Sequence, residues 1–143
     1  MSARQTLLNL NPENSYREWL ANIRKAQRHN GEIPGVVPTG SWGYNVGPAW
    51  DAVLINLPYF TYLYRGDKEI LKENAHAIFA YADFLDGKRT EKGTVNYGLG
   101  DWCPVTVLKS PVEFTSTVIS MDSMKKAAFI FYVLGMKKQE EFC

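Results

Sequence analysis

Two tryptophans, each beside a carboxylate, are the residues of this sequence that most directly suggest a chemical role. Trp50 precedes Asp51 in the run Gly-Pro-Ala-Trp-Asp-Ala, and Trp102 follows Asp101 in the run Tyr-Gly-Leu-Gly-Asp-Trp. An indole ring packs well on the C–H face of a sugar, and a carboxylate accepts hydrogen bonds from hydroxyl groups. The two pairs therefore predict a carbohydrate-binding site with two stacking rings and two acids for hydroxyl contacts.

Each member of these pairs also has a purely structural interpretation. Trp50 could anchor the start of a helix in the core, and Asp51 could be a first-turn acid that interacts favourably with the helix dipole. Trp102 is harder to explain as core, because a glycine-rich run precedes it and Cys103-Pro104 follows it. A sugar-binding role is therefore favoured for Asp101 and Trp102, while the sugar-binding and the structural interpretation both stay open for Trp50 and Asp51.

The remaining acids are better explained by structure than by catalysis. Asp67 has the position of a helix N-cap, Glu113 lies in the first turn of a helix, and Glu32 is expected to be a solvated loop acid. The sequence contains no Ser/His/Asp arrangement, phosphate-binding glycine motif or metal-ligand cluster. We therefore predict no catalytic residue in this chain, no metal site and no cofactor.

Composition restricts the class of protein. The chain has 143 residues, is 45% hydrophobic and 22% charged, and carries a formal net charge of +1. These values fit one globular domain, and they give no electrostatic reason to expect nucleic acid or an anionic membrane as a partner. No apolar run approaches the ~20 residues of a membrane helix, and no signal peptide is visible, so the compartment is left open.

The hydrophobic spacing predicts helices joined alternately by long loops and short turns. We expect a helix from an Asn11 N-cap to Gly31, a second over 48–64 that Pro58 kinks or splits, and a third over 67–87. A fourth should cover 111–134 with Gly135 as its C-cap, and the start of a fifth should follow from residue 137. Loops 32–47 and 87–111 separate them.

This order is that of stacked helical hairpins whose long loops gather at one end. The predicted fold class is therefore all-α, without a strand of useful length. Loops longer than ~12–15 residues in a compact domain are usually functional. Both tryptophan–acid pairs lie in such a loop or at its end, which places the predicted site at the loop end of the hairpins.

Three runs of the sequence resemble the catalytic domain of bacterial α-L-rhamnosidases. The first is Y-x-x-W-L-x-x-I-x-x-A-Q-x-x-x-G-x-I-P-x-V-x-P-x-x-S, which starts at Tyr16. The second is G-P-A-W-D-A…P-Y…Y-L-Y-x-G-D-x-x-I-L, which starts at Gly47, and the third is Y-G-L-G-D-W-C-P, which starts at Tyr97. With the tail V-L-G-M-K-K, the resemblance covers roughly residues 14 to 143 in matching order.

The resemblance implies an (α/α)6 six-hairpin barrel and an inverting glycoside hydrolase that removes terminal α-L-rhamnose. Trp50 and Trp102 fall on aromatic positions of the family's sugar pocket, and Asp51 and Asp101 fall on the neighbouring acids. One departure is that many members place a residue between this tryptophan and the aspartate, whereas Asp51 follows Trp50 directly.

The resemblance also implies that both catalytic carboxylates lie outside this chain. The family's general acid belongs to a D-x-x-x-x-E motif followed by G-W-x-G-D, which does not precede the helix near Asn11, and its general base comes from a later hairpin. Residues 1–143 are therefore expected to be a single partial domain, inactive alone, whose unpaired helix faces promote self-association. The alternatives are a non-catalytic helical scaffold module and a six-hairpin glycosidase for another sugar.

Overall fold

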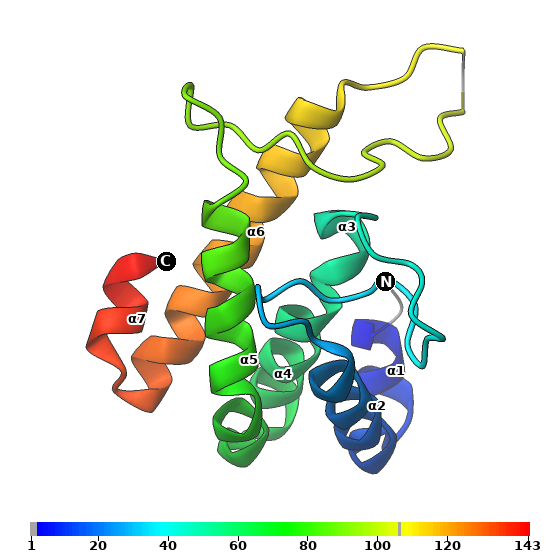
Figure 1. The fold of residues 1–143 in the computed structure, drawn as a ribbon. Coiled ribbons are helices and arrows are strands. Elements are labelled where there is room, and N and C mark those ends of the chain that lie inside the picture. The colour runs from blue at the N-terminus through cyan, green and yellow to red at the C-terminus, as the bar shows by residue number, and fades with distance from the viewer. Residues whose placement is uncertain (1–2, 106) are drawn as a thin grey trace.

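The computed structural model describes residues 3–105 and 107–143. This part of the chain is helical, apart from loops and one isolated antiparallel bridge between Arg89 and Val95 (Figure 1). The helices are α1 (Ala3–Asn9), α2 (Glu13–Ala26), α3 (Pro48–Asp51), α4 (Val53–Arg65), α5 (Lys68–Asp86), α6 (Val112–Leu134) and α7 (Lys137–Phe142). The all-α prediction is confirmed, and within the described residues no helix is long and apolar enough to cross a membrane.

Local sequence signals explain where the longer helices begin and end. Gly66 takes the left-handed conformation that ends α4, and the Asp67 side chain then caps α5 by accepting a hydrogen bond from Ile70 N at 3.1 Å. Gly135 ends α6 in the same left-handed way. The predicted cap at Asp67 and the predicted stop at Gly135 are both confirmed.

Three boundaries differ from the prediction. Pro12, and not Asn11, occupies the N-cap position of α2, and this helix ends at Ala26, five residues before Gly31. The predicted second helix divides at Ala52 into α3 and α4, whereas Pro58 lies inside α4. Helix α1 was not predicted, because a seven-residue segment carries too few turns for hydrophobic periodicity to be recognised.

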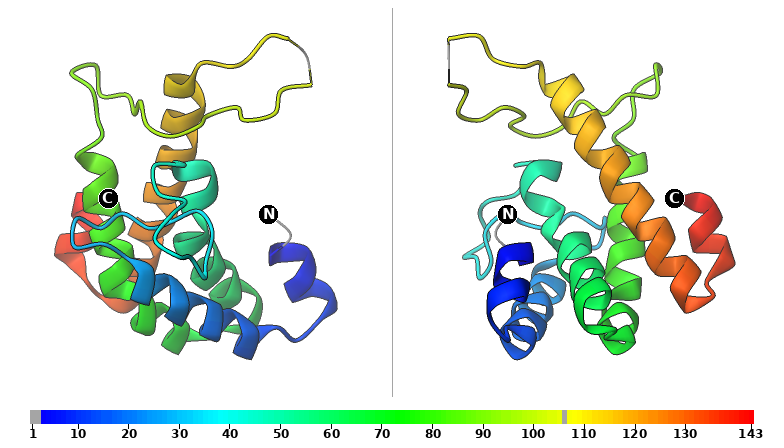
Figure 2. Two further views of the ribbon diagram at one scale, coloured as in Figure 1. Left: turned by 45° about the vertical axis from the view of Figure 1, so that its right-hand side comes forward. Right: turned by 180° about the vertical axis from the view of Figure 1, so that it is seen from behind.

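The helices pack as neighbouring hairpins around a single apolar core. Helix α5 lies between α4 and α6, α2 packs against α4 and α5, and α7 folds back on α6 (Figure 2). Arg17 on α2 reaches α5, where it bonds Asp67 Oδ2 at 2.6 Å. The centre of the core is formed by side chains from α2, α4, α5 and α6, among them Leu20, Ile23, Leu54, Leu57, Ile70, Ile78, Tyr81, Ile130 and Phe131.

The two long loops cover residues 27–47 and 87–111, and they meet at two glycines. Leu99 N donates to Val46 O at 2.9 Å, which places Gly47 directly against Gly98. A Cβ on Gly98 would lie 2.4 Å from Gly47 Cα and 2.5 Å from Val46 O, so neither backbone has room for a side chain. Both glycines also have positive φ, at 94° and 91°. Only glycine therefore satisfies the steric and the conformational requirement at this crossing.

Replacement of Gly98 by alanine should therefore destabilise the chain strongly. Gly98→Ala combines backbone overlap with a left-handed φ, and we expect the free energy of unfolding to fall by about 3 kcal/mol or more. Gly66→Ala is the matched control, because Gly66 has φ 69° but nothing within 4 Å of an added Cβ. It should cost only about 1 kcal/mol. Urea unfolding curves of the two variants measure the difference, and equal losses would contradict the close approach.

Candidate functional site

The first tryptophan–acid pair lies in α3, which begins where loop 27–47 ends. Gly47 turns the chain and Pro48 occupies the first helical position, where its missing N–H costs nothing. The Trp50 ring is half-buried and lines a hollow of about 260 Å³ between α1 and α4, together with Arg4 and Phe60. Asp51 does not line this hollow and has no exposed surface. The two members of this pair therefore face different surroundings.

The second pair lies in loop 87–111 and is more open. Asp101 is half-buried, and its Oδ2 accepts a hydrogen bond from Ser110 N at 3.2 Å, which ties two distant points of the loop together. The Trp102 side chain is 65% exposed. Loop 87–111 extends beyond the ends of α5 and α6 (Figure 1). Trp102 is thus available to a ligand, whereas Asp101 already has a structural hydrogen bond.

The glycine crossing brings the two sequence motifs together. Gly47 opens the run that contains Trp50 and Asp51, and Gly98 stands shortly before Asp101. The hollow that Trp50 lines does not include Trp102. The structure therefore joins the two motifs through their backbones, while the two indole rings do not share this hollow.

Glu32 is a buried residue of this region that the sequence interpretation placed in solvent. Its exposed fraction is only 3%, so the prediction of a solvated loop acid is wrong. Its Oε1 accepts from Asn45 N at 2.9 Å, and its Oε2 forms an ion pair with Arg28 at 2.8 Å. The Arg28 guanidinium in turn lies 3.5 Å from the centre of the Tyr44 ring. The apolar Ile33-Pro34 that follows Glu32 was the available sequence signal for burial.

Tyr97 connects Glu32 with Asp51. Its hydroxyl group lies 3.2 Å from Glu32 Oε1 and 3.5 Å from Asp51 Oδ2, and the ring is buried against Phe84. The Ser116 hydroxyl donates to Tyr97 O at 2.7 Å and holds this part of the loop on α6. Tyr97 therefore packs against Phe84 and also bridges two acids from separate segments.

The electrostatics of this cluster follow from its burial. Burial first, and the nearby Glu32 charge second, raise the pKa of Asp51 to about 8, although the Tyr97 hydrogen bond opposes them. Burial and the same two acids raise the pKa of Tyr97 well above its usual range. Asp51 Oδ1 and the Tyr81 hydroxyl are buried without a hydrogen-bond partner among the described residues. Burial therefore favours the neutral form of both Asp51 and Tyr97 at pH 7.

The remaining features of this region are the contacts of Glu113 and the arrangement of possible metal ligands. Glu113 lies in the first turn of α6, as predicted, and accepts a hydrogen bond from the Thr94 hydroxyl. Within residues 3–105 and 107–143, no three His, Cys, Asp or Glu side chains come together as metal ligands would. The chemistry of this region is therefore that of buried carboxyl groups, a phenol and partly open indoles.

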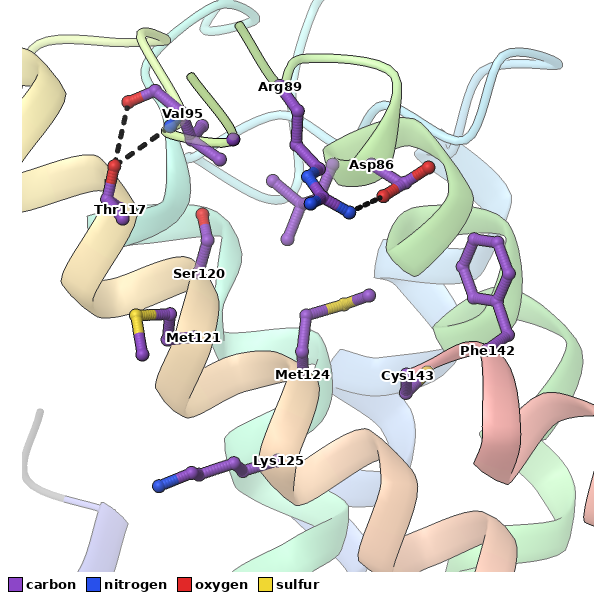
Figure 3. A pocket seen from close by; sticks show the side chains of 12 residues that line it. Asp86, Arg89, Val95, Thr117, Ser120, Met121, Met124, Lys125, Phe142 and Cys143 are labelled. Atoms are coloured by element: carbon purple, nitrogen blue, oxygen red, sulfur yellow. Dashed lines mark hydrogen bonds and ion pairs between the residues drawn. The ribbon is translucent and has the colours of Figure 1, made fainter. Parts of the chain in front are cut away.

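A separate pocket of about 320 Å³ lies between α5, α6 and α7, away from all four predicted site residues (Figure 3). Met121 and Met124 of α6 and Phe142 of α7 give it an apolar lining. Two of its polar members, Arg89 and Thr117, are already bonded to Asp86 and to the Val95 backbone, whereas the buried Ser120 hydroxyl has no partner among the described residues. The pocket therefore has the character of a packing surface between helices more than that of a sugar site.

Comparisons with known proteins agree with the helical architecture. Residues 1–141 match the family model described as the bacterial alpha-L-rhamnosidase 6 hairpin glycosidase domain. An alpha-L-rhamnosidase of Formosa agariphila is 26% identical over 108 residues, which are 68% of this chain and 11% of that protein. One of Streptomyces avermitilis is 26% identical over 119 residues, 82% of this chain and 11% of that protein.

Solved structures give the same result. The alpha-L-rhamnosidase of Dictyoglumus thermophilum superimposes with a TM-score of 0.88 at 29% identity, over 99% of this chain and 16% of that one. The Streptomyces avermitilis alpha-L-rhamnosidase, solved in complex with L-rhamnose, superimposes with a TM-score of 0.84 at 24% identity, over 94% of this chain and 13% of that one. The second likeness is one of fold alone.

The matched region is a small share of each relative, since the chain spans only 11% of the length of either curated protein. Within that share, the model match extends from the first residue to residue 141, and the helical order agrees with the solved structures. The chain therefore belongs to the bacterial α-L-rhamnosidase six-hairpin glycosidase family.

Proposed function

We propose that this chain forms part of the sugar pocket of a glycoside hydrolase that removes terminal α-L-rhamnose. The observation that carries the proposal is the crossing of Gly47 and Gly98, which joins the two tryptophan–acid motifs in a chain of this family. Support for rhamnose comes from two relatives named alpha-L-rhamnosidases and from a similar structure that holds L-rhamnose.

Within this pocket the four predicted residues have separate roles. Trp102, exposed at the loop end, stacks on the sugar ring, and Trp50 supplies a second aromatic wall. Asp101 contributes a carboxyl group for hydroxyl contacts, although it first has to share its Ser110 hydrogen bond. Asp51, predicted from the sequence as a second hydroxyl contact, has no exposed surface and acts on the pocket by positioning α3. These roles are supported by residue chemistry and by the family positions on which the residues fall.

The reaction that we propose is inverting, with both catalytic carboxyl groups supplied by other parts of the six-hairpin domain. An inverting enzyme holds a general acid and a general base roughly 6.5–9.5 Å apart, so that a water molecule fits between base and sugar. Glu32 and Asp51 both lie at the same Tyr97 hydroxyl and are buried, which leaves no room for sugar and water between them. This pair is therefore a structural and positioning element.

An apolar stripe on α6 supports the proposal that further helices complete the domain. Phe114, Val118, Met121 and Tyr132 are exposed along this helix, whose other face already packs on the core. A helix that is apolar on all sides is normally buried. In the assembled domain other hairpins cover this stripe, and the isolated chain self-associates through it.

The two alternative functions, a non-catalytic scaffold module and a six-hairpin glycosidase for another sugar, differ in whether they require an exposed tryptophan. A scaffold needs no open tryptophan, and the 65% exposure of Trp102 speaks against it. A six-hairpin glycosidase for another sugar would use the same open indole, so that alternative is separated by substrate.

Hydrolysis of an aryl α-L-rhamnoside tests the proposed function. The chain extended in both directions by its genomic flanks should release the aryl group, because it regains both carboxyl groups, whereas residues 1–143 alone should be inactive. Aryl α-L-arabinofuranoside and aryl β-D-glucoside serve as comparison substrates. Inactivity of the extended protein on the rhamnoside would overturn the assignment, and activity on another glycoside would replace the sugar. Activity of the 143-residue chain would show that it contains the catalytic carboxyl groups.

Trp102→Ala in the extended protein tests the stacking role. Loss of a ring that covers one sugar face removes roughly 1.5 kcal/mol of binding, so KM should rise about tenfold. Trp42→Ala is the matched control, because Trp42 is similarly exposed, at 63%, in the other long loop but lies outside both motifs. Steady-state kinetics measure both, and an equal KM in the two variants would refute stacking by Trp102.

A further inference from the structure

We propose that Glu32 and Tyr97 are positioning residues for Asp51: Asp51 is held as a neutral acid that donates to the Tyr97 oxygen, while Tyr97 donates to Glu32. In this relay, Asp51–Tyr97–Glu32, the one hydrogen of the Tyr97 hydroxyl goes to the nearer acceptor Glu32, which is in turn paired with Arg28. That Asp51 belongs to a sugar pocket rests on the proposed function, whereas the direction of the relay depends only on the contacts within this chain.

Three hydrogen-bond donors surround the Glu32 carboxylate. Its Oε2 receives the Arg28 guanidinium at 2.8 Å, and its Oε1 receives Asn45 N at 2.9 Å and the Tyr97 hydroxyl at 3.2 Å. Three donors, one of them cationic, stabilise an ionised carboxylate. Glu32 is therefore the charged member of the acid pair.

Asp51 has no comparable set of donors. Its Oδ2 has the Tyr97 hydroxyl at 3.5 Å as a neighbour, and its Oδ1 has no partner among the described residues. A phenol carries a single hydrogen, and the nearer acceptor of that hydrogen is Glu32. The contact between Asp51 and Tyr97 is then a hydrogen bond only if Asp51 supplies its own proton.

The balance of charge in the cluster leads to the same result. From loop 27–47, Arg28 neutralises Glu32, and from loop 87–111 the Lys88 ammonium lies over the Tyr97 ring, 5.2 Å from its centre. Helix α5 contributes the Tyr81 phenol, whose charged form would be opposed by Asp51. No cation is bonded to Asp51 itself in the described part of the chain.

Two cationic groups on other neighbouring helices, Lys126 and Arg4, already have partners elsewhere. On α6, Lys126 bonds Asn56 and Asp122, and on α1, Arg4 bonds the Tyr64 hydroxyl. A second buried carboxylate beside Glu32 would thus remain without a counter-charge, at a high cost in desolvation. Retention of one proton on Asp51 removes that cost.

The relay gives the proposed pocket a mechanical role for Glu32. It links loop 27–47, helix α3 and loop 87–111 through three side chains, close to the point where the two glycines cross. Because Trp50 immediately precedes Asp51 in α3, the relay also fixes the orientation of the helix that carries this indole. Above the pKa of Asp51, this side chain loses the proton that it donates to Tyr97. The two carboxylates of Asp51 and Glu32 then both face the Tyr97 hydroxyl.

The test is a pH titration of the 143-residue chain, followed by the side-chain carboxyl ¹³C shift of Asp51 and assigned with Asp51→Asn. We expect Asp51 to titrate near pH 8. Glu32→Gln should lower this pKa, because it removes the neighbouring negative charge. Glu91→Gln, in which an exposed acid outside the cluster is neutralised, should leave it unchanged. A pKa of Asp51 below about 5, or no response to Glu32→Gln, would overturn the proposal.

Stability against pH gives a second readout that does not need the Glu32 variant to fold. Between the unfolded pKa near 3.8 and the folded pKa near 8, the native chain holds a proton that the unfolded chain lacks. The free energy of unfolding should therefore fall as pH rises from 4 to 8, and this contribution should level off above 8. Asp51→Asn should remove that component of the slope, whereas Asp83→Asn, at an exposed position of α5, should keep it.

An unchanged slope in Asp51→Asn would overturn the relay. Neither measurement contains a rhamnoside, so both stand whether or not the extended protein hydrolyses one. Failure of the relay and failure of the proposed function are therefore observed separately.

Discussion

The backbones at Gly47 and Gly98 approach so closely that no side chain fits between them, and the site is arranged around this contact. Two loops that are far apart in sequence are held together there by the bond from Leu99 N to Val46 O. Helix α3 starts directly after the first glycine, and Tyr97 directly precedes the second. The direction of α3 and the position of Tyr97 are therefore set by one steric constraint, which only glycine satisfies at both positions.

Burial of two acids is a consequence of the same arrangement. With α3 held against both loops, Asp51 has no exposed surface and Glu32 almost none, while the one paired guanidinium, that of Arg28, is bonded to Glu32 and not to Asp51. Two buried carboxylates with one counter-charge are unstable unless one keeps its proton, so the raised pKa of Asp51 follows from the geometry of the crossing. The close backbone approach of Gly47 and Gly98 thus leads to the burial that favours the protonated form of Asp51.

The sequence was sufficient for the parts of the fold that local signals determine. The Asp67 cap, the Gly135 stop, the long helices α5 and α6 and the all-α class were predicted because capping and periodicity act within a few residues. Burial of Glu32 was missed because it depends on Arg28, Asn45 and Tyr97, and Tyr97 lies 65 positions away. The break at Ala52 was likewise missed, since proline at position 58 was the only local signal for an interruption.

The apolar character of α6 links the fold of this chain to the larger domain in which we propose that it functions. Its buried face completes the core, while Phe114, Val118, Met121 and Tyr132 form a second apolar face that the described helices leave open. Helices with two apolar faces are stable when they lie between other helices, as they do in a six-hairpin arrangement. The relatives are many times longer than the matched region, so the pocket walls and the catalytic groups of such a domain have ample sequence in which to reside. Under the proposed function, residues 1–143 contribute the joined loops, and the second apolar face of α6 is the surface that we expect the remaining hairpins to cover.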